Sequence, residues 1–369
     1  MTKLSWLLWF PAVTSFAAPP AKTLLSECLR GGGPSYECSF QAPADAADKH
    51  VRVVLDGSMS QVAILLNGEL LGERHSGVTP FELDLTPALK TGATNQLAVR
   101  LDKTGRLRSL YLLTTGRVYP VSQTISASPQ RIAVSVMVRN TLDNTAGVQA
   151  SFEISINGKA VASGSVNAAV PPNLTQPMEA LIPLRPEDVK LWDPDHPNLY
   201  RIRTVVAKNA EAVEGAYETE IESPFGIRTV EIQGSHFLLN GEPLRLGGAH
   251  PAGEPAEAEL QSMKEAGMVF QMLDHPVSTS MLEWADRNGL LLIEKAEMRE
   301  RDCNHPSVIA WVGETPPDFI IATPETLGRW PGRAVFLDGI PTPDGILELL
   351  SKYPGVFGAA VSTTTDPRW

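Results

Sequence analysis

Hydrophobic and polar residues alternate along much of the chain before residue 228, in short runs with one apolar face. In Ile132–Val138, for example, every second side chain is a larger aliphatic one, as in a strand that packs on a core. Such runs flank the pairs Asn67-Gly68, Asn157-Gly158 and Asn240-Gly241. Because Asn-Gly supplies the two positive-φ positions of a type I′ turn, we expect a hairpin at each pair. The pattern predicts an all-β first half.

After Asn240 the pattern changes to alternating buried strands and amphipathic helices, which is typical of βα units. One helix is predicted over Ala256–Ala266, and a second ends at Gly289 after a capping box of Ser280 and Glu283. A complete (β/α)₈ barrel has eight strands and about 250 residues, so a partial barrel, a barrel completed by another chain or an open sheet is expected. The predicted strands are Leu244–Gly248, Val269–Leu273, Leu290–Ile293, Val308–Trp311, Ala334–Leu337 and Val356–Val361.

The first residues have the pattern of an export signal. Lys3 precedes the apolar run Leu4–Val13, and small residues stand at Ala17 and Ala18, where signal peptidase would cut. The run is shorter than the roughly 20 residues that span a bilayer, so we predict a signal peptide over residues 1–18 and no membrane span. The mature chain is expected in the periplasm or outside the cell.

Composition narrows the classes of partner. The formal net charge is −11, and nucleic-acid binding needs clustered basic residues, so no nucleic-acid partner is expected. The chain has three cysteines, of which export would allow Cys28 and Cys38 to pair, leaving Cys303 as an odd thiol. The oligomeric state is not indicated by the sequence.

Several sequence blocks occur in one order along the chain, and the most specific of them is Asn304-His305-Pro306-Ser307 followed by Val308–Trp311. Together they resemble glycoside hydrolase family 2, the β-galactosidase and β-glucuronidase family. The blocks that precede this one are residues 62–72, 77–86, 95–100, 191–200, 225–228, 237–248, 263–267 and 285–294.

The resemblance implies a multidomain protein. It predicts a jelly-roll sugar-binding-like domain over residues 23–118, an immunoglobulin-like β-sandwich over 119–227 and an incomplete TIM-type (β/α) barrel over 228–369. The implied activity is hydrolysis of O-glycosyl bonds in β-glycosides by a retaining mechanism, with carbohydrate as substrate or ligand.

Such a mechanism needs a general acid/base and a second carboxylate roughly 5 Å away as nucleophile. The resemblance assigns the general acid/base to Glu314, but Gly313 stands where the family has Asn. Val269 and Met272 stand where it has Asn and Arg in the second barrel strand, and no later acidic residue has a family-like context. We therefore expect weak or lost catalysis. The alternatives are a non-catalytic carbohydrate-binding or structural remnant and a truncated gene product.

Two further residues are candidates for substrate binding. His275 is either a substrate contact or a structural histidine, and Glu294 at a strand end either lines the cleft or is solvated. With His250 these residues lack the close spacing of metal ligands, so neither a metal nor another cofactor is expected.

Overall fold

The chain divides into two compact units, Met1–Tyr119 with Ala210–Glu220, and Pro120–Asn209 with Ile221–Trp369. None of the helices within the ranges given below is long and apolar enough to cross a membrane. This computed structural model describes residues 21–25, 28, 34–42, 46, 49–58, 61–74, 81–103, 105–208, 219–233, 236–244, 248–249, 254–273, 277–295, 299–312 and 319–321.

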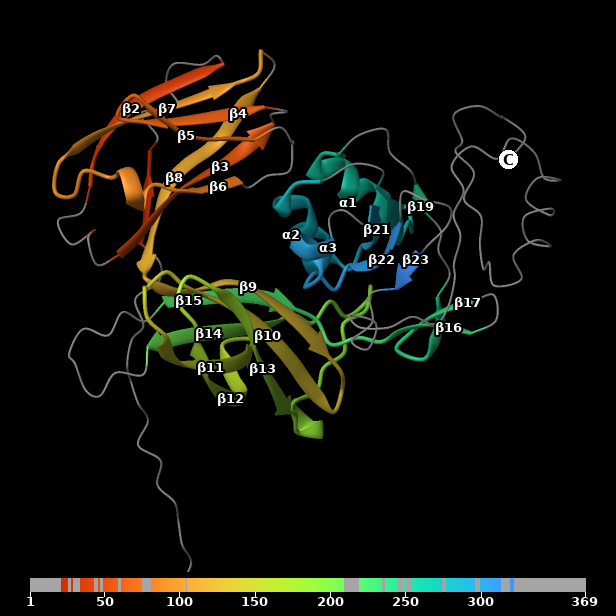
Figure 1. Cartoon of the computed structure of the whole chain (residues 1–369). Helices are drawn as coiled ribbons and strands as arrows, with labels where there is room; N and C mark the ends of the chain where they lie inside the picture. The colour runs from red at the N-terminus through yellow and green to blue at the C-terminus, as the bar shows by residue number, and fades with distance from the viewer. Residues whose placement is uncertain are drawn as a thin grey trace, which may run out of the picture. The chain divides into compact units, whose positions relative to one another are not determined.

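The first unit is a β-sandwich of two four-stranded sheets, with orders β1-β8-β3-β6 and β2-β7-β4-β5 (Figure 1). Their inner faces enclose a core that includes Leu55, Ile64, Leu66 and Val99. The strands are β1 (Ala21–Leu24), β2 (Ser35–Gln41), β3 (Lys49–Ser58), β4 (Val62–Leu66), β5 (Glu69–Arg74), β6 (Phe81–Asp84), β7 (Thr94–Leu101) and β8 (Arg106–Gly116), with a short 3₁₀ turn, η3, at Thr86–Ala88.

The second unit contains another β-sandwich, with sheets β13-β10-β9 and β12-β11-β14-β15. Buried residues alternate with mostly half-buried ones along β10, where Ile132, Val134, Val136 and Val138 are all buried. The strands are β9 (Val118–Ala127), β10 (Arg131–Asn140), β11 (Ala146–Ile156), β12 (Lys159–Val170), β13 (Thr175–Pro183), β14 (Tyr200–Lys208) and β15 (Thr219–Phe225), with a 3₁₀ turn, η4, at Pro186–Asp188.

The three Asn-Gly hairpins are confirmed. Asn67, Asn157 and Asn240 have φ values of 54°, 51° and 55°, and the glycine that follows each of them also has a positive φ. The turns join β4 to β5, β11 to β12, and β17 to β18. The structure also pairs Cys28 with Cys38 in a disulfide.

The remainder of the second unit consists of a small antiparallel sheet, β16-β17-β18, and a five-stranded sheet, β19-β20-β21-β22-β23, with three helices. Strands β19, β20, β21 and β22 run parallel to one another. The elements are β16 (Val230–Gln233), β17 (His236–Leu239), β18 (Glu242–Leu244), β19 (Gly248–Ala249), α1 (Glu257–Glu265), β20 (Phe270–Met272), α2 (Thr279–Asn288), β21 (Leu291–Lys295), α3 (Arg299–Asp302), β22 (Val308–Val312) and β23 (Phe319–Ile321).

Two apolar layers cover this sheet. On one face Leu291 and Ile293 pack with Trp192, and on the other Leu292 packs with α2 residues such as Leu282. Trp284 and Trp311 lie in the helix-side layer and are part of the core.

The sheet departs from the expected barrel at its last strand. β23 pairs antiparallel with β22 over Ala310–Val312, so the two strands form a hairpin and not a βα unit. Within the described ranges the sheet is open and mixed, and no closed barrel is present. The strands predicted at 334–337 and 356–361 lie outside the described residues.

The predicted end of the second helix is confirmed, whereas its start is wrong. Gly289 ends α2 in the left-handed conformation, with φ 71°. The N-cap is Ser278, whose hydroxyl accepts from the Met281 amide at 3.2 Å, and not Ser280. Ser, Thr, Asp and Asn are all strong N-caps, so two nearby serines leave the start ambiguous in the sequence.

Candidate functional site

The candidate site lies at the carboxyl ends of β20, β21 and β22, the edge at which βα barrels build active sites. Glu294 is the functional candidate within the described residues there. It stands at the end of β21 opposite Trp311 of β22 and is 2% exposed. It is therefore not solvated, which corrects one of the two sequence interpretations.

Glu294 points to the helix side of the sheet. Side chains alternate along a strand, so Glu294 shares a face with Leu292, which packs under α2. Asp302 at the end of α3 hydrogen-bonds the Glu294 carboxyl. Asp302 in turn binds Arg301 through two nitrogens, at 2.5 and 2.7 Å. The opposite face of the strand, which a barrel turns inward, carries Ile293.

These neighbours keep a proton on Glu294. Burial, followed by the negative charge of Asp302, raises the pKa of Glu294 to about 8, against which Arg301 acts more weakly. The hydrogen bond with Asp302 raises the pKa further. A carboxyl group that is neutral at pH 7 is a hydrogen-bond donor and a poor nucleophile, so in this position Glu294 acts as an internal linker between β21 and α3.

A second buried carboxylate, Asp286 of α2, organises the Asn304–Ser307 block. One oxygen accepts from the Ser307 amide at 3.1 Å and from its hydroxyl at 2.6 Å. The other lies 2.5 Å from His305 Nδ1. Burial lowers the pKa of His305, but the hydrogen bond and charge of Asp286 outweigh it and leave the pKa raised. Asp286 holds Ser307 and His305 separately, so the group is not arranged as a nucleophilic triad.

The same block joins the five-stranded sheet to the β-sandwich of the second unit. The Asn304 side chain accepts from the Ile125 amide at 2.9 Å and donates to the Gln123 carbonyl at 2.8 Å, both on β9. Fully buried Arg228, just after the sandwich, donates to the Pro306 and Val308 carbonyls. The Asn304–Ser307 block thus has a structural role that sequence reasoning missed.

Trp192 and Gly226 belong to the same joint, which is the contact between the five-stranded sheet and the β-sandwich of the second unit. The Trp192 indole nitrogen donates to the Asp286 carbonyl at 2.9 Å, and the residue is fully buried. A Cβ on Gly226 would come within 2.6 Å of Pro306 Cβ and 2.9 Å of Trp192 Cβ, so only glycine fits there. The contacts link both parts of the second unit through short-range packing as well as hydrogen bonds.

The other predicted site residues fall outside the described ranges. His275 follows β20, and Glu314 comes two residues after Val312, the end of β22. His250 also lies outside. Among the residues with a described placement, no group of three or more His, Cys, Asp or Glu is arranged to hold a metal ion. Cys303 is a partly exposed cysteine outside the disulfide.

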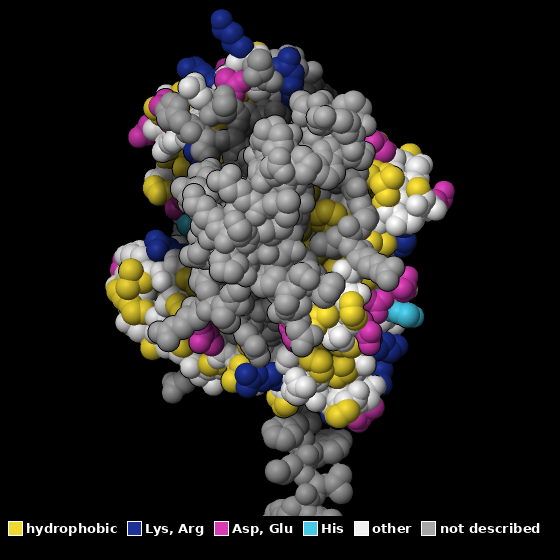
Figure 2. Space-filling model, turned by 90° about the vertical axis from the view of Figure 1, so that its right-hand side faces the viewer, with side chains coloured by type: hydrophobic (Ala, Val, Ile, Leu, Met, Phe, Trp, Pro, Cys, Tyr) yellow, Lys and Arg dark blue, Asp and Glu magenta, His cyan; other side chains and the backbone are white. Residues whose placement is uncertain are grey.

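Figure 2 shows the types of side chain on one face of the molecule. On the described side chains in view, basic and acidic residues are interspersed with small apolar groups, and no broad basic stripe is present.

The described residues form two β-sandwiches followed by a mixed sheet with three helices. Residues 118–228 match the family described as "Glycosyl hydrolases family 2". A β-galactosidase of Bacteroides ovatus, BoGH2A, is 28% identical and covers 77% of this chain. A β-galactosidase of Thermoanaerobacter pseudethanolicus is 26% identical and covers 75%.

Solved structures agree on the fold. A glycosyl hydrolase family 2 member from Bacteroides cellulosilyticus has a TM-score of 0.66 at 24% identity, covering 76% of this chain and 42% of that one. β-Glucuronidase 2 of Bacteroides uniformis, solved with a covalently bound cyclophellitol-6-carboxylate aziridine, has a TM-score of 0.64 at 22% identity, covering 76% and 40%. The chain is a glycoside hydrolase family 2-like protein. It spans 39% and 44% of the length of the two β-galactosidases named above.

Proposed function

We propose that the chain is a β-glycoside-recognising protein in which Glu314 holds the place of the general acid/base and turnover is weak or lost. The observation that carries this proposal is the burial of Glu294. It is the acidic side chain at the carboxyl end of β21, and it is turned to the helices and kept protonated by burial and by Asp302. It therefore does not supply the second carboxylate that retaining hydrolysis requires.

The sequence departures support weak turnover. Gly313 replaces the family's Asn beside the acid/base, which removes a polar contact to the sugar. Met272 replaces a basic residue and packs in the apolar layer of the sheet. Without a nearby positive charge, a second carboxylate at this edge would be harder to keep ionised.

For the architecture we propose a jelly-roll fold over residues 23–118, an immunoglobulin-like fold over 119–227, and descent of β19 to β22 from the first four strands of a TIM-type barrel. The parallel order of these four strands, with α1 and α2 between successive strands, supports the barrel relation. The antiparallel β23 marks where this chain departs from the repeat.

We also propose export to the periplasm or the cell exterior. The apolar leader with Ala17 and Ala18 supports it, as does the Cys28–Cys38 disulfide, since structural disulfides persist in oxidising compartments. N-terminal sequencing of protein from the cell envelope tests this, with Ala18 or Pro19 as the expected first residue and retained Met1 as the contrary result.

The enzyme proposal is tested with chromogenic β-galactoside, β-glucuronide, β-glucoside and β-mannoside substrates. We expect little turnover by the natural protein and, for any substrate that is hydrolysed, a loss of about 10² to 10⁴ in rate in Glu314→Gln. Glu294→Gln is the matched control, because it changes a carboxyl of the helix layer, and its rate should match that of the natural protein. A robust rate that Glu294→Gln abolishes would reverse the roles assigned to these two residues.

A non-catalytic carbohydrate-binding protein is the second candidate function. The antiparallel pairing of β23 with β22 favours it, because the strand that follows Glu314 in the sequence does not continue the βα repeat. This candidate function predicts that a glycoside binds to the natural protein and to Glu314→Gln with equal affinity. Neither protein should hydrolyse it.

A further inference from the structure

Strand β12 is an open edge of the four-stranded sheet β12-β11-β14-β15 (Figure 1). It is 12 residues long and pairs with β11 from Lys159 to Val170, with one irregularity at Val161 next to the turn. In an antiparallel sheet, every second residue of an edge strand directs its N–H and C=O groups away from the partner strand. β12 therefore presents a row of backbone groups that can pair with a further strand.

Side chains from elsewhere in the fold bond to the backbone at the end of this strand. The Gln176 side chain donates to the Ala169 carbonyl at 3.1 Å, and Asn140 donates to the Val170 carbonyl at 3.0 Å. Among the residues that the structure describes, no side chain bonds to the backbone of residues 162–168. The middle of β12 is thus the uncovered part of the edge.

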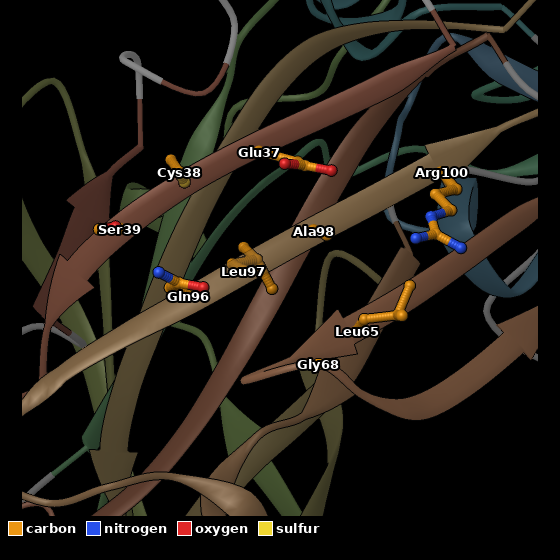
Figure 3. Close-up of a pocket in the computed structure, with 9 residues that line it drawn as sticks. All are labelled: Glu37, Cys38, Ser39, Leu65, Gly68, Gln96, Leu97, Ala98 and Arg100. Atoms are coloured by element: carbon orange, nitrogen blue, oxygen red, sulfur yellow. The ribbon is translucent and has the colours of Figure 1, made fainter.

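The sequence of β12 also lacks the usual protection of an edge strand. Charged side chains, proline, short length or a covering group normally keep such an edge from pairing with another molecule. From Ala160 to Val170, β12 has no charged residue and no proline. Each other edge strand of the two sandwiches has one of these features: short length and charge in β1 and β6, Glu37 in β2, whose side chain stands out from the strand in Figure 3, charges at Glu69, Glu73 and Arg74 in β5, Asn304 bound to β9, Pro177 and Pro183 in β13, and Pro224 with two glutamates in β15.

An uncharged strand of small residues fits a second copy of itself. Two copies that pair antiparallel about a two-fold axis bring each residue opposite a residue of the same strand. With the axis at Ser165, the middle of residues 162–168, Ser163 of one copy lies opposite Asn167 of the other. Like charges directly opposite each other are destabilising, so the absence of charge from this run favours pairing with itself.

Exposed leucines on the neighbouring strand add apolar surface near this edge. Ile182 of β13 packs against β12 at Gly164, where a Cβ would come within 2.9 Å of the Ile182 side chain. β13 therefore borders β12. Leu181 of β13 is 65% exposed, and Leu174, just before β13, is 53% exposed. Burial of these side chains by a second copy would add to the backbone pairing.

We infer that β12 is a self-association surface, through which two copies of this chain form a dimer that joins their four-stranded sheets into one. The two β12 strands pair antiparallel around Ser165. Each copy has a formal net charge of −11, which repels the other at long range. The dimer is therefore weak, forms at high protein concentration and strengthens with salt, which screens the repulsion. It does not depend on Glu314 or on turnover.

The test is sedimentation velocity on the full-length mature protein over a range of concentrations. We expect a monomer–dimer equilibrium with a Kd of roughly 10 to 100 μM, as for a small interface. Raising the salt concentration from about 0.05 M to about 0.5 M should lower the Kd severalfold. Amide hydrogen exchange in β12 should slow as the protein concentration rises, because pairing protects the outward N–H groups.

Two double variants test the register of the pairing. Ser163 and Asn167 are both exposed. Ser163→Lys with Asn167→Lys brings lysines opposite each other across the two-fold axis and should raise the Kd about tenfold or more. Ser163→Lys with Asn167→Glu brings opposite charges together and should keep the Kd of the natural protein or lower it.

A control variant separates local repulsion from net charge. Gln96→Lys changes an exposed residue on β7, a central strand of the first unit, and should not raise the Kd. Added lysines make an acidic chain less charged, so a weaker dimer in the double-lysine variant reflects repulsion at β12. Unchanged unfolding temperatures show that the variants are folded.

Three results would overturn the inference. The first is a protein that stays monomeric at about 200 μM in about 0.5 M salt, far above the expected Kd. The second is a dimer that the double-lysine variant does not weaken, which would place the interface elsewhere. The third is an equal loss of affinity in both double variants, which would exclude antiparallel pairing of β12 with itself around Ser165.

Discussion

The side chain of Asn304 hydrogen-bonds the backbone of β9 as a neighbouring strand would. Its oxygen lies 2.9 Å from the Ile125 amide nitrogen. The same side chain reaches the Gln123 carbonyl at 2.8 Å. β9 is the edge strand of its sheet, so these two bonds occupy backbone groups that no strand pairs. The residue that belongs to the most family-like block of the sequence thus joins two parts of one unit.

Replacing Asn304 should destabilise the second unit. Asn304→Ala leaves a buried donor and acceptor without partners, and we expect a loss of about 2 kcal/mol in the free energy of unfolding. Urea denaturation measures it, with Asn167→Ala on the exposed side of β12 as the control. Equal losses in the two variants would show that the Asn304 contacts contribute little.

Glu294 should make stability fall as pH rises. Its pKa is about 8 in the folded protein against 4.5 for an ordinary glutamate side chain, so the folded state holds the proton more tightly between these values. Deprotonation favours unfolding over that window, and stability decreases from about pH 4.5 to about pH 8.

Glu294→Gln removes the titration and keeps a hydrogen-bond donor for Asp302. The free energy of unfolding of this variant should exceed that of the natural protein by roughly 1 to 3 kcal/mol at pH 7. Near pH 4.5 the two proteins should be equally stable. Denaturation curves at several pH values measure this. A difference between the two proteins that does not change with pH would contradict a protonated Glu294.

His305 should contribute a second pH dependence, which begins above pH 6.5. Its pKa is raised by Asp286 despite burial, so its contribution is complete below pH 6.5 and is lost as pH rises through the folded value. The Glu294→Gln variant should still lose stability above pH 6.5. Adding His305→Gln to this variant should remove that loss. A histidine that titrates at 6.5 or below in NMR spectra would exclude the Asp286 interaction.

Gly226→Ala should destabilise the joint by roughly 2 kcal/mol or more, because its Cβ meets the Pro306 ring and Trp192 Cβ, which cannot easily move. Gly164→Ala is the comparison, since its Cβ meets the more flexible side chain of Ile182 at 2.9 Å. Thermal unfolding of both variants measures the difference. A smaller effect at Gly226 would mean that the joint adjusts by a small shift.

Local chemistry accounts for what the sequence predicts well. Asn-Gly turns and the Gly289 helix end depend on the conformation of one or two residues, and both are readable without the rest of the fold. The alternation along β10 is equally local. These features define the sandwiches and the parallel strands in outline.

The candidate site depends on distant pairings that a single sequence does not reveal. Glu294 stands at a strand end, where a solvated or cleft-lining role is the usual expectation, and its burial depends on Asp302 and α3. The bond from Asn304 to Ile125 spans 179 residues. The antiparallel pairing of β23 likewise depends on the direction that the chain takes after β22.

The capping of β9 by Asn304 also has a consequence for solubility. An edge strand with bare backbone groups is a template for pairing with another molecule, and a side chain that bonds to those groups blocks the template. If the sandwich is expressed alone, without the segment that contains Asn304, the Ile125 amide and Gln123 carbonyl lose their partners. The isolated sandwich should therefore self-associate through β9, whereas protein that retains the Asn304–Ser307 block should not do so by this route.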